Sequence, residues 1–429
     1  MRHVLSALAT TLAVAMSAAL ASAPALAETT VIHAGAVLAD ADGDPSGPAT
    51  ITVEDGVIVG IEPGHTAPPG EAQLVDLRTM TVLPGMIDLH VHLTGDPGGD
   101  FWKAAVEPDE WDVVVGMKNA RLTALAGFTT VREAGSAGQT AYSLRRGTAE
   151  GLIPGPRIVA AGPALSIVGG HGDTNGFRPE INEVLDTGFN CTGPVQCAEK
   201  VRLASQNGAD VIKITATGGV LSQQGRGLEA HFTDAEMKSI ADTAHSLGLK
   251  VMAHAHGARG IEAAARAGID TIEHSTYIDR DAARAMREND VVLVPTLMAF
   301  RGVTERLGQG VYTPVVEEKI RAVAEQAQVF MRQAREWGVQ IAFGTDAGVF
   351  EHGRNAEELA MMVAQGMTNR EALASTTTVA AQVLEMEDEI GRLAPGYSAD
   401  IIAVSGNPLD DITVLENVDW VMVRGRIVE

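Results

Sequence analysis

The middle of the chain alternates short apolar segments with longer amphipathic ones. Helical stretches such as 234–247 and 317–337 separate eight short segments that are nearly continuous in apolar residues. Strands buried on both faces and separated by helices are typical of a parallel sheet. Eight such repeats predict an α/β chain folded as a (β/α)8 barrel. The predicted strands are 85–92, 128–132, 157–162, 210–215, 250–256, 270–274, 291–296 and 339–346.

The two ends of the chain follow a different pattern of short alternating strands and turns. This predicts a small β-sandwich built from both termini, residues 28–83 together with 391–429, beside a barrel of residues 84–390. An open doubly wound sheet is the alternative to the barrel. No glycine-rich dinucleotide motif follows the first predicted barrel strand, which favours the barrel.

Residues 1–27 have the features of a signal peptide. Arg2 supplies a positive start, an apolar run covers Val4 to Ala19, and Ala25-Leu26-Ala27 is a small-x-small cleavage pattern. An uncleaved membrane anchor is the alternative, but the short apolar run and the cleavage pattern favour removal. We therefore expect an exported, periplasmic protein that starts at Glu28 and has no stable membrane association.

Composition narrows the classes of partner. The chain has 429 residues, and 32 Lys and Arg against 55 Asp and Glu give a net charge of −23. Such an acidic surface repels phosphate backbones and anionic lipids, so we expect no nucleic-acid partner. Small molecules and cationic cofactors remain compatible with this charge.

The only cysteines, Cys191 and Cys197, lie six positions apart in a loop-like stretch. In an oxidising compartment this spacing favours a local disulfide. A pair of metal thiolates is the alternative, but it is weaker because no histidine lies close in sequence.

Ionisable side chains gather at the carboxyl ends of the predicted strands, which is the face where barrels of this type have their active sites. They come from five different strands, which core packing does not explain. They are His90, His92, Lys213, His254, His256, His274 and Asp346.

The chemistry of these groups suits a metal site. His90 and His92 are two positions apart, so both imidazoles point to the barrel interior. Lys213 also points inward and must pair, lose its proton or be modified. A neutral amine takes up carbon dioxide to give a carbamate that can bridge two metals, and a structural ion pair is the alternative. Asp346 could be an ordinary strand-end residue, but its place at the barrel mouth favours a functional role. Imidazoles and carboxylates without thiolates suit zinc.

Six motifs in order resemble the metal-dependent amidohydrolase superfamily, and most of all its exported prolidase-like dipeptidases and ochratoxin-type amidases. The resemblance covers essentially the whole chain after the signal peptide. The motifs are Pro84–His92, Asp210–Ile214, Ala253–Gly257, Ile272–His274, Gly344–Gly348 and Gly391–Val404.

The resemblance implies two divalent metal ions, usually zinc. His90, His92 and Asp346 would hold one ion, His254 and His274 the other, and a carboxylated Lys213 would bridge them. Two cations lower the pKa of a bridging water to about 7. The resulting hydroxide would attack an amide carbonyl next to a terminal carboxylate, while Asp346 moves the proton to the leaving nitrogen.

The remaining candidate residues are mostly in loops, where they can contact the substrate. His171 follows the third predicted strand in a glycine-flanked loop, and resembling enzymes use an equivalent histidine to contact substrate. We expect His171 and His256 to bind the substrate and assist catalysis. A loop histidine that only fixes the backbone is the alternative for His171. Asn175, Arg226 and His231 lie in neighbouring loops, and nothing in the sequence chooses among them.

Two further readings stay open. One is a cyclic-amide hydrolase of the same superfamily, similar to imidazolonepropionase, although those enzymes generally use one metal and lack the bridging lysine. The other is a non-catalytic periplasmic metal or solute carrier, which would not need Asp346 beside an open coordination position. The family resemblance also suggests assembly of several copies of the chain.

Overall fold

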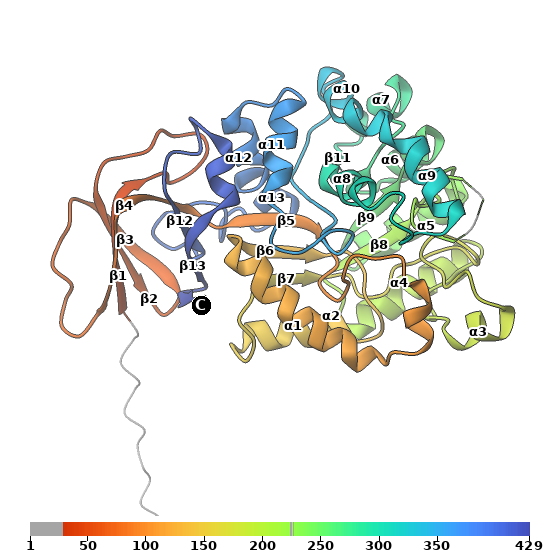
Figure 1. Cartoon of the computed structure of the whole chain (residues 1–429), viewed down its shortest axis with the longest axis horizontal. Helices are drawn as coiled ribbons and strands as arrows, with labels where there is room; N and C mark the ends of the chain where they lie inside the picture. Colours follow the sequence, from red (N-terminus) through yellow and green to blue (C-terminus); the bar gives the residue numbers. More distant parts are fainter. Residues whose placement is uncertain (1–28, 224, 226) are drawn as a thin grey trace, which may run out of the picture.

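The computed structural model describes residues 29–223, 225 and 227–429. The predicted signal peptide and Arg226 lie outside the described residues. A sheet formed from the two ends of the chain lies at one end of the molecule, and a larger body of parallel strands and helices forms the rest (Figure 1).

The terminal sheet has seven strands in the order β14-β13-β12-β4-β1-β2-β3. Its two halves join where β12 runs antiparallel to β4. The predicted combination of both termini therefore forms, but in one sheet and not in a two-sheet sandwich. The edges of that sheet meet, because a Cβ on Gly425 would lie 2.5 Å from the Cα of Gly56. The strands are β1 (Thr29–Val37), β2 (Ala49–Glu54), β3 (Val57–Pro63), β4 (Gln73–Pro84), β12 (Ile401–Val404), β13 (Val418–Val423) and β14 (Arg426–Ile427).

Seven of the eight strands predicted for the barrel are present, in two parallel sheets. Six of these strands are buried over nearly their whole length, as the continuous apolar pattern requires, whereas β7 alternates buried and half-buried residues. The three-stranded sheet contains β5 (Met86–Val91), β6 (Phe128–Glu133) and β7 (Arg157–Ala160). The four-stranded sheet contains β8 (Val211–Thr215), β9 (Lys250–Ala255), β10 (Thr271–His274) and β11 (Val292–Val294).

The eighth predicted strand, 339–346, is not a regular strand. Its segment lies between the two sheets and touches both through isolated bridges, Ile341 with Leu293 and Ala347 with Val91. The segment is nevertheless hydrogen-bonded on both sides, since the N–H of Ala342 donates to the carbonyl of Leu293 and that of Asp346 to the carbonyl of His90. Asp346 itself adopts a left-handed backbone, with φ of 62°. An isolated bridge between Leu165 and Ile214 spans the other gap. The structure thus has two regular sheets that do not close into one ladder, and backbone hydrogen bonds of irregular segments cross both gaps between them.

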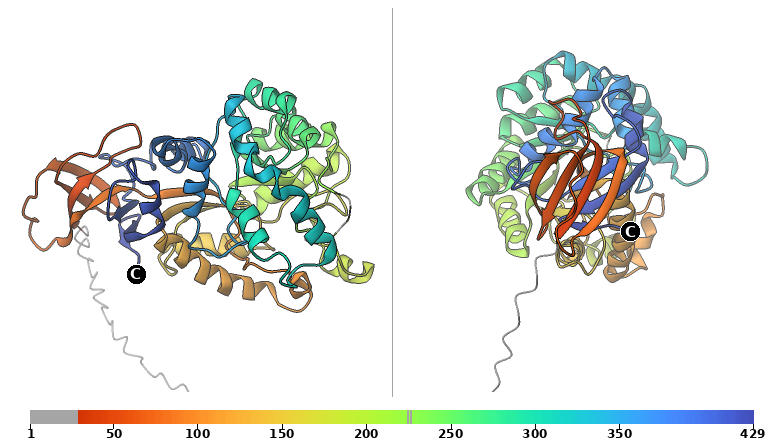
Figure 2. Two further views of the ribbon diagram at one scale, coloured as in Figure 1. Left: turned by 45° about the horizontal axis from the view of Figure 1, so that its top comes forward. Right: turned by 90° about the vertical axis from the view of Figure 1, so that its left-hand side faces the viewer.

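Helices lie around these two sheets, as Figure 1 and the left view of Figure 2 show. The predicted helix 234–247 forms as α5, which starts with a capping box between Thr233 and Glu236. The predicted helix 317–337 is broken into α9, η2 and α10. The α-helices are α1 (Asp109–Leu125), α2 (Thr140–Ala149), α3 (Pro179–Val184), α4 (Pro194–Asn207), α5 (Asp234–Ser246), α6 (Ala258–Ala267), α7 (Arg280–Glu288), α8 (Leu297–Glu305), α9 (Pro314–Ala324), α10 (Phe330–Glu336), α11 (Glu357–Ala364), α12 (Asn369–Ser375) and α13 (Thr378–Val383), and the 3-10 turns are η1 (Phe101–Ala105), η2 (Gln326–Gln328) and η3 (Ile412–Glu416).

The predicted disulfide is confirmed, since Cys191 and Cys197 are bonded with a Cα–Cα distance of 5.1 Å. Both cysteines are buried, and the backbone N–H of Cys191 donates to the carbonyl of Ser166. The bond therefore fastens the start of α4 to the loop that follows β7. In the part of the chain that is described, no helix has the length and apolar character needed to cross a membrane.

Candidate metal centre

A cavity of about 430 Å³ opens at the carboxyl ends of the parallel strands. All eight residues assigned catalytic, metal-binding or substrate-binding roles from the sequence line it, although they come from six segments of the chain. These residues are His90, His92, His171, Lys213, His254, His256, His274 and Asp346.

Asp346 lies between His90, which belongs to β5, and His92, which directly follows that strand. Its Oδ1 is 3.4 Å from the Nε2 of His90 and 3.4 Å from the Nε2 of His92. The backbone sets this arrangement, because the N–H of Asp346 donates to the carbonyl of His90 at 2.7 Å. The backbone hydrogen bonds between the irregular eighth segment and β5 thus bring a carboxylate to two imidazoles.

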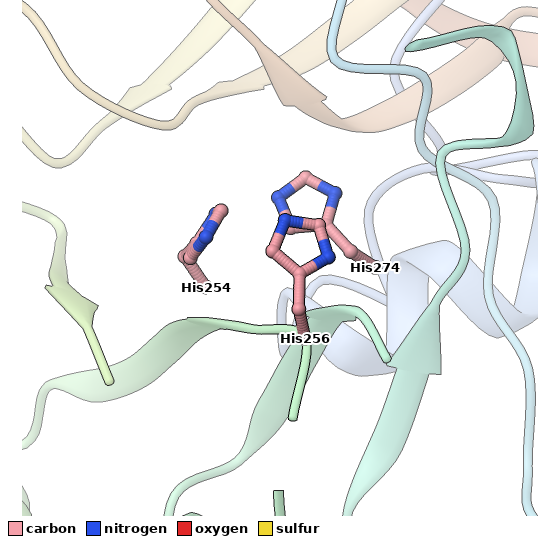
Figure 3. Close-up of side chains that lie close together, drawn as sticks. All are labelled: His254, His256 and His274. Atoms are coloured by element: carbon pink, nitrogen blue, oxygen red, sulfur yellow. The ribbon is translucent and has the colours of Figure 1, made fainter. Parts of the chain in front are cut away.

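Three further imidazoles face one another across the ends of β9 and β10 (Figure 3). His254, His256 and His274 each place a possible ligand atom within 4.8 Å of the others, and His274 does the same with His90 and Asp346. His274 therefore lies between the two groups. The sequence predicts that His256 binds substrate. In the structure its imidazole lies as close to His254 and His274 as these two predicted metal ligands lie to each other.

Most of these imidazoles are oriented by a hydrogen bond at Nδ1, which leaves Nε2 for a ligand. Such outer partners fix the tautomer of metal-binding histidines. His254 differs, because its Nε2 lies 3.2 Å from the carbonyl of Gly218. The Nδ1 partners are Glu273 for His90 at 2.8 Å, the Gly135 carbonyl for His92 at 2.8 Å, Thr276 for His256 at 2.7 Å and Thr296 for His274 at 2.6 Å.

Glu273 and Arg132 form a buried ion pair behind His90, with the Arg132 Nη2 3.0 Å from the Glu273 Oε1. The Thr271 hydroxyl donates to the same oxygen at 2.6 Å. Sequence analysis missed Glu273, although a carboxylate inside an apolar strand is a signal for such a partner. Strand alternation did not reveal this role of Glu273, because the regular strand ends at the next residue, His274, whose φ is 72°.

Lys213 is buried, and its Nζ lies 3.4 Å from the Nε2 of His90. Burial lowers the pKa of this amine, while the carboxylates of Glu273 and Asp346 oppose the shift. The balance favours a lysine that can lose its proton, as carbamate formation requires.

The imidazoles of the site are neutral at physiological pH, as metal ligands must be. Burial is the largest cause in every case, and the Lys213 charge adds to it for His90. It lowers the pKa of His92 to about 4 and that of His256 to about 3. Burial also raises the pKa of Asp346 against the attraction of Lys213. Nitrogen and oxygen donors packed this densely with little water fit a divalent metal site.

Asp88 holds the backbone around His90 and Asp346 in place. The sequence analysis did not identify this role, although Asp88 lies in the motif that contains His90. It accepts hydrogen bonds from the Thr345 hydroxyl at 2.6 Å, from the Asn355 amide at 2.8 Å and from the backbone N–H of His90 at 3.1 Å. Because Thr345 precedes Asp346, one buried carboxyl group positions the ends of both segments.

The remaining loop residues separate into two kinds. The ring of His171 lies against that of His254, with centroids 4.3 Å apart, and its Nδ1 is 3.2 Å from the Ser222 hydroxyl. Asn175 and His231 do not line the cavity. The side-chain oxygen of Asn175 accepts from the backbone N–H of Gln223 instead, so this residue fixes a loop.

A family model described as "Amidohydrolase family" matches residues 81–428. The chain belongs to the amidohydrolase family. This confirms the resemblance drawn from the motifs, and it identifies the amidohydrolase as a hydrolase of the prolidase- and ochratoxinase-like branch.

Individual relatives match this amidohydrolase over nearly its whole length. Ochratoxinase of Aspergillus niger is 32% identical over 423 residues, which cover 91% of this chain and 84% of that protein. A Xaa-Pro dipeptidase crystallised with methionine in its active site has 38% identity and a TM-score of 0.87, over 94% of this chain and all of the other. A prolidase complexed with N-methylphosphonate-L-proline has 32% identity and a TM-score of 0.85, over 94% and 99% of the two chains.

The rest of the cavity wall in this amidohydrolase is largely apolar. It suits a small organic molecule with few polar groups beyond those that reach the histidines. The apolar side chains that line it are Ala134, Val220, Leu221, Phe300, Val303 and Val349.

Proposed function

We propose that this amidohydrolase cleaves the amide bond next to a terminal carboxylate, as in dipeptides or N-acyl amino acids. The observation that carries the proposal is the convergence of eight predicted site residues on one largely apolar cavity. The bound groups named for two related structures, methionine and a phosphonate analogue of an acylated proline, support an amino-acid product or substrate.

We propose that the cofactors are two divalent metal ions, with zinc favoured by the donor set. His90, His92 and Asp346 are proposed to hold one ion, and His254 and His274 the other. A carboxylated Lys213 is proposed to bridge them. When bound, the ions would acidify a water molecule and polarise the carbonyl of the substrate.

The side chains of this chain then have separate tasks. Asp346 would take the proton from the attacking water at Oδ1 and pass it to the leaving nitrogen. His171 and His256, which reach the cavity from a loop and from the end of β9, would bind the substrate carboxylate or polarise its carbonyl. The apolar wall would exclude water from the bond that is cleaved.

We also propose that the protein is exported, with residues 1–27 as a cleaved signal peptide. A periplasmic location fits the disulfide, since such bonds persist in oxidising compartments. N-terminal sequencing of the secreted protein tests this, and a mature chain that does not start near Glu28 would contradict it.

The function is tested with purified mature protein, by measuring bound metal and the hydrolysis of Xaa-Pro, Xaa-Arg or Xaa-Lys dipeptides and N-acyl amino acids. Chelation should abolish hydrolysis, and zinc should restore it. Asp346→Asn should lower kcat at least about a hundredfold, because the proton carrier is lost. A carrier protein would bind its ligand equally well in the Asp346→Asn variant.

Two controls separate the alternatives. Lys213→Ala should lose activity and one metal equivalent, and small carboxylic acids should restore part of both if the lysine is carboxylated. Unchanged metal content in this variant would contradict the bridging role. Imidazolonepropionase of Rhizorhabdus wittichii is 28% identical over 393 residues. Turnover of a cyclic amide with no cleavage of linear amides would therefore favour that second activity.

A further inference from the structure

Lys319 of α9 is a buried lysine close to the cavity, and the proposed mechanism does not use it. The residue is only 8% exposed. Its Nζ donates to the carbonyls of Gly219 and Ser222, at 2.8 and 2.5 Å. Both carbonyls belong to the loop that follows β8, and the two residues between them, Val220 and Leu221, line the cavity. A positive charge therefore lies behind one wall of the cavity.

The amine of Lys319 is charged at physiological pH. Burial lowers its pKa to about 8, which leaves most of it protonated at pH 7. Carbonyl oxygens have no net charge, so the hydrogen bonds to Gly219 and Ser222 hold the amine without neutralising it. Because a buried charge costs more free energy than a buried neutral donor, fixing a loop does not by itself explain a lysine at this position.

The charge lies next to the two histidines that are proposed to bind the substrate. Gly219 packs so closely against the ring of His171 that a Cβ on this glycine would lie 2.2 Å from the ring Cε1. The hydroxyl of Ser222 is 3.2 Å from the Nδ1 of the same ring. The positive charge of Lys319 also reaches His256, where it adds to the effect of burial in lowering the pKa of the imidazole. Lys319 therefore acts on the part of the cavity that contains His171 and His256.

A substrate carboxylate in this part of the cavity needs a positive charge nearby. Of the described residues that line the cavity, Lys213 alone has a cationic side chain, and the proposed function assigns it to the metal ions. His171 and His256 are neutral imidazoles. A carboxylate that is removed from water requires a charged partner, and the net charge of −23 on the whole chain opposes the entry of an anion.

We propose that Lys319 is a positioning residue that gives this amidohydrolase a preference for substrates with a free terminal carboxylate. This role rests on the proposed function, to which it adds the origin of the preference. His171 and His256 would touch the carboxylate, while Lys319 fixes the loop beside them and supplies the charge that balances it. The expected substrates are dipeptides or N-acyl amino acids with an ionised C-terminal group, and not the corresponding amides.

Lys319→Met tests the proposal, because it removes the charge and keeps an unbranched side chain. With a dipeptide that the wild type cleaves, the variant should raise KM at least about tenfold and change kcat less than about twofold, since the charge attracts the carboxylate equally in the ground and transition states. Binding of the same dipeptide as its C-terminal amide should not change. It is measured as KM, or as a competitive inhibition constant where the amide is cleaved too slowly.

Thr313→Val is the matched control for the loop. The hydroxyl of Thr313, at the start of α9, donates to the side-chain oxygen of Gln223 at 2.8 Å. The change therefore removes another bond between α9 and the same loop without removing a charge, and any effect should be equal for acid and amide. Lys319→Gln keeps a hydrogen-bond donor but no charge, and it replaces Lys319→Met if thermal unfolding shows that the latter is not folded.

The comparison of acid and amide also separates this proposal from the proposed function. An unchanged KM for the acid in the uncharged variant, or equal losses for acid and amide, would make Lys319 a purely structural residue and overturn the proposal. A wild type that binds acid and amide equally well would overturn it too. In each of these cases cleavage of the dipeptide by the wild type would leave the proposed function intact. A wild type that cleaves no linear amide would contradict the proposed function, and this role with it.

Discussion

His256 and His274 have the same kind of support, although they come from different strands. Each places Nδ1 within 2.7 Å of a threonine hydroxyl, Thr276 for His256 and Thr296 for His274. The two threonines are fully buried and therefore offer matched substitutions to valine. The substitutions distinguish a histidine that binds metal from one that binds substrate.

Thr296→Val should lower metal affinity about 10- to 100-fold, because His274 loses the partner that fixes its tautomer and orientation. Thr276→Val should leave the metal content unchanged and raise KM, if His256 binds substrate as predicted. Metal titration and steady-state kinetics measure both. Loss of metal in Thr276→Val would instead make His256 a third ligand beside His254.

The proposed metal ligands were easier to predict from the sequence than the buried residues that hydrogen-bond to them. His90 and His92 follow from strand alternation alone, and Lys213 follows from its position in an apolar strand. Asp88 and Glu273 did not, because their roles depend on partners 257 and 183 positions away in the chain. No local pattern indicates such contacts.

At the scale of elements, α8 (Leu297–Glu305) connects the site to the outer helices. Its first N–H groups, from Leu297 and Met298, donate to the two carboxylate oxygens of Glu358 on α11, at 2.7 and 2.6 Å. Glu358 is fully buried, and its two oxygens accept the N–H groups that a capping side chain would otherwise bind. The same helix carries Phe300, which lines the cavity.

Glu358→Gln should lower the free energy of unfolding by about 2 kcal/mol, because one N–H of α8 loses its acceptor and faces an amide donor. The same change should raise KM, since Phe300 moves with the helix. Glu357→Gln is the matched control, because that neighbour makes only surface ion pairs and should cost less than about 1 kcal/mol. Denaturant unfolding and kinetics measure both, and equal effects of the two changes would contradict the capping role.

The eighth segment shows where prediction from hydrophobic pattern stops. The apolar residues of 339–346 correctly predict a buried segment between β11 and β5, yet the pattern carries no information on backbone angle. Asp346 adopts a left-handed backbone with φ of 62°, and its Oδ1 lies 3.4 Å from the Nε2 of His90. The helix predicted for 317–337 is interrupted for a similar reason, because amphipathic spacing alone does not locate the break at η2.

For the whole molecule, sequence pattern predicts which segments belong together and fails on how their strands pair. The alternating flanks indicate correctly that both termini share one β-structure. A sandwich and a single curled sheet have the same alternation, however. Only the pairing of β12 with β4 and the contact of Gly56 with Gly425 decide between them.

The side chain of His352 connects three segments that are distant in sequence: its own loop, α1 and the end of β5. It follows the eighth segment, its Nδ1 is 3.1 Å from the Thr123 hydroxyl of α1, and its Nε2 is 3.1 Å from the carbonyl of His92. Burial lowers its pKa to about 4, against 6.5 in an unfolded chain. Between these values the unfolded state binds more protons than the folded state, so this group destabilises the fold as the pH falls.

The free energy of unfolding should therefore contain a contribution of up to about 3 kcal/mol that is complete above pH 6.5 and is lost progressively down to pH 4. In His352→Gln this contribution is absent, so the stability gap between wild type and variant should narrow as the pH falls from 7 to 5. Thr123→Val removes the same hydrogen bond without a titrating group, and its gap should stay constant. Denaturant unfolding at pH 7, 6 and 5 measures both, and a constant gap for His352→Gln would show that the pKa of the ring is the same in the folded and unfolded states.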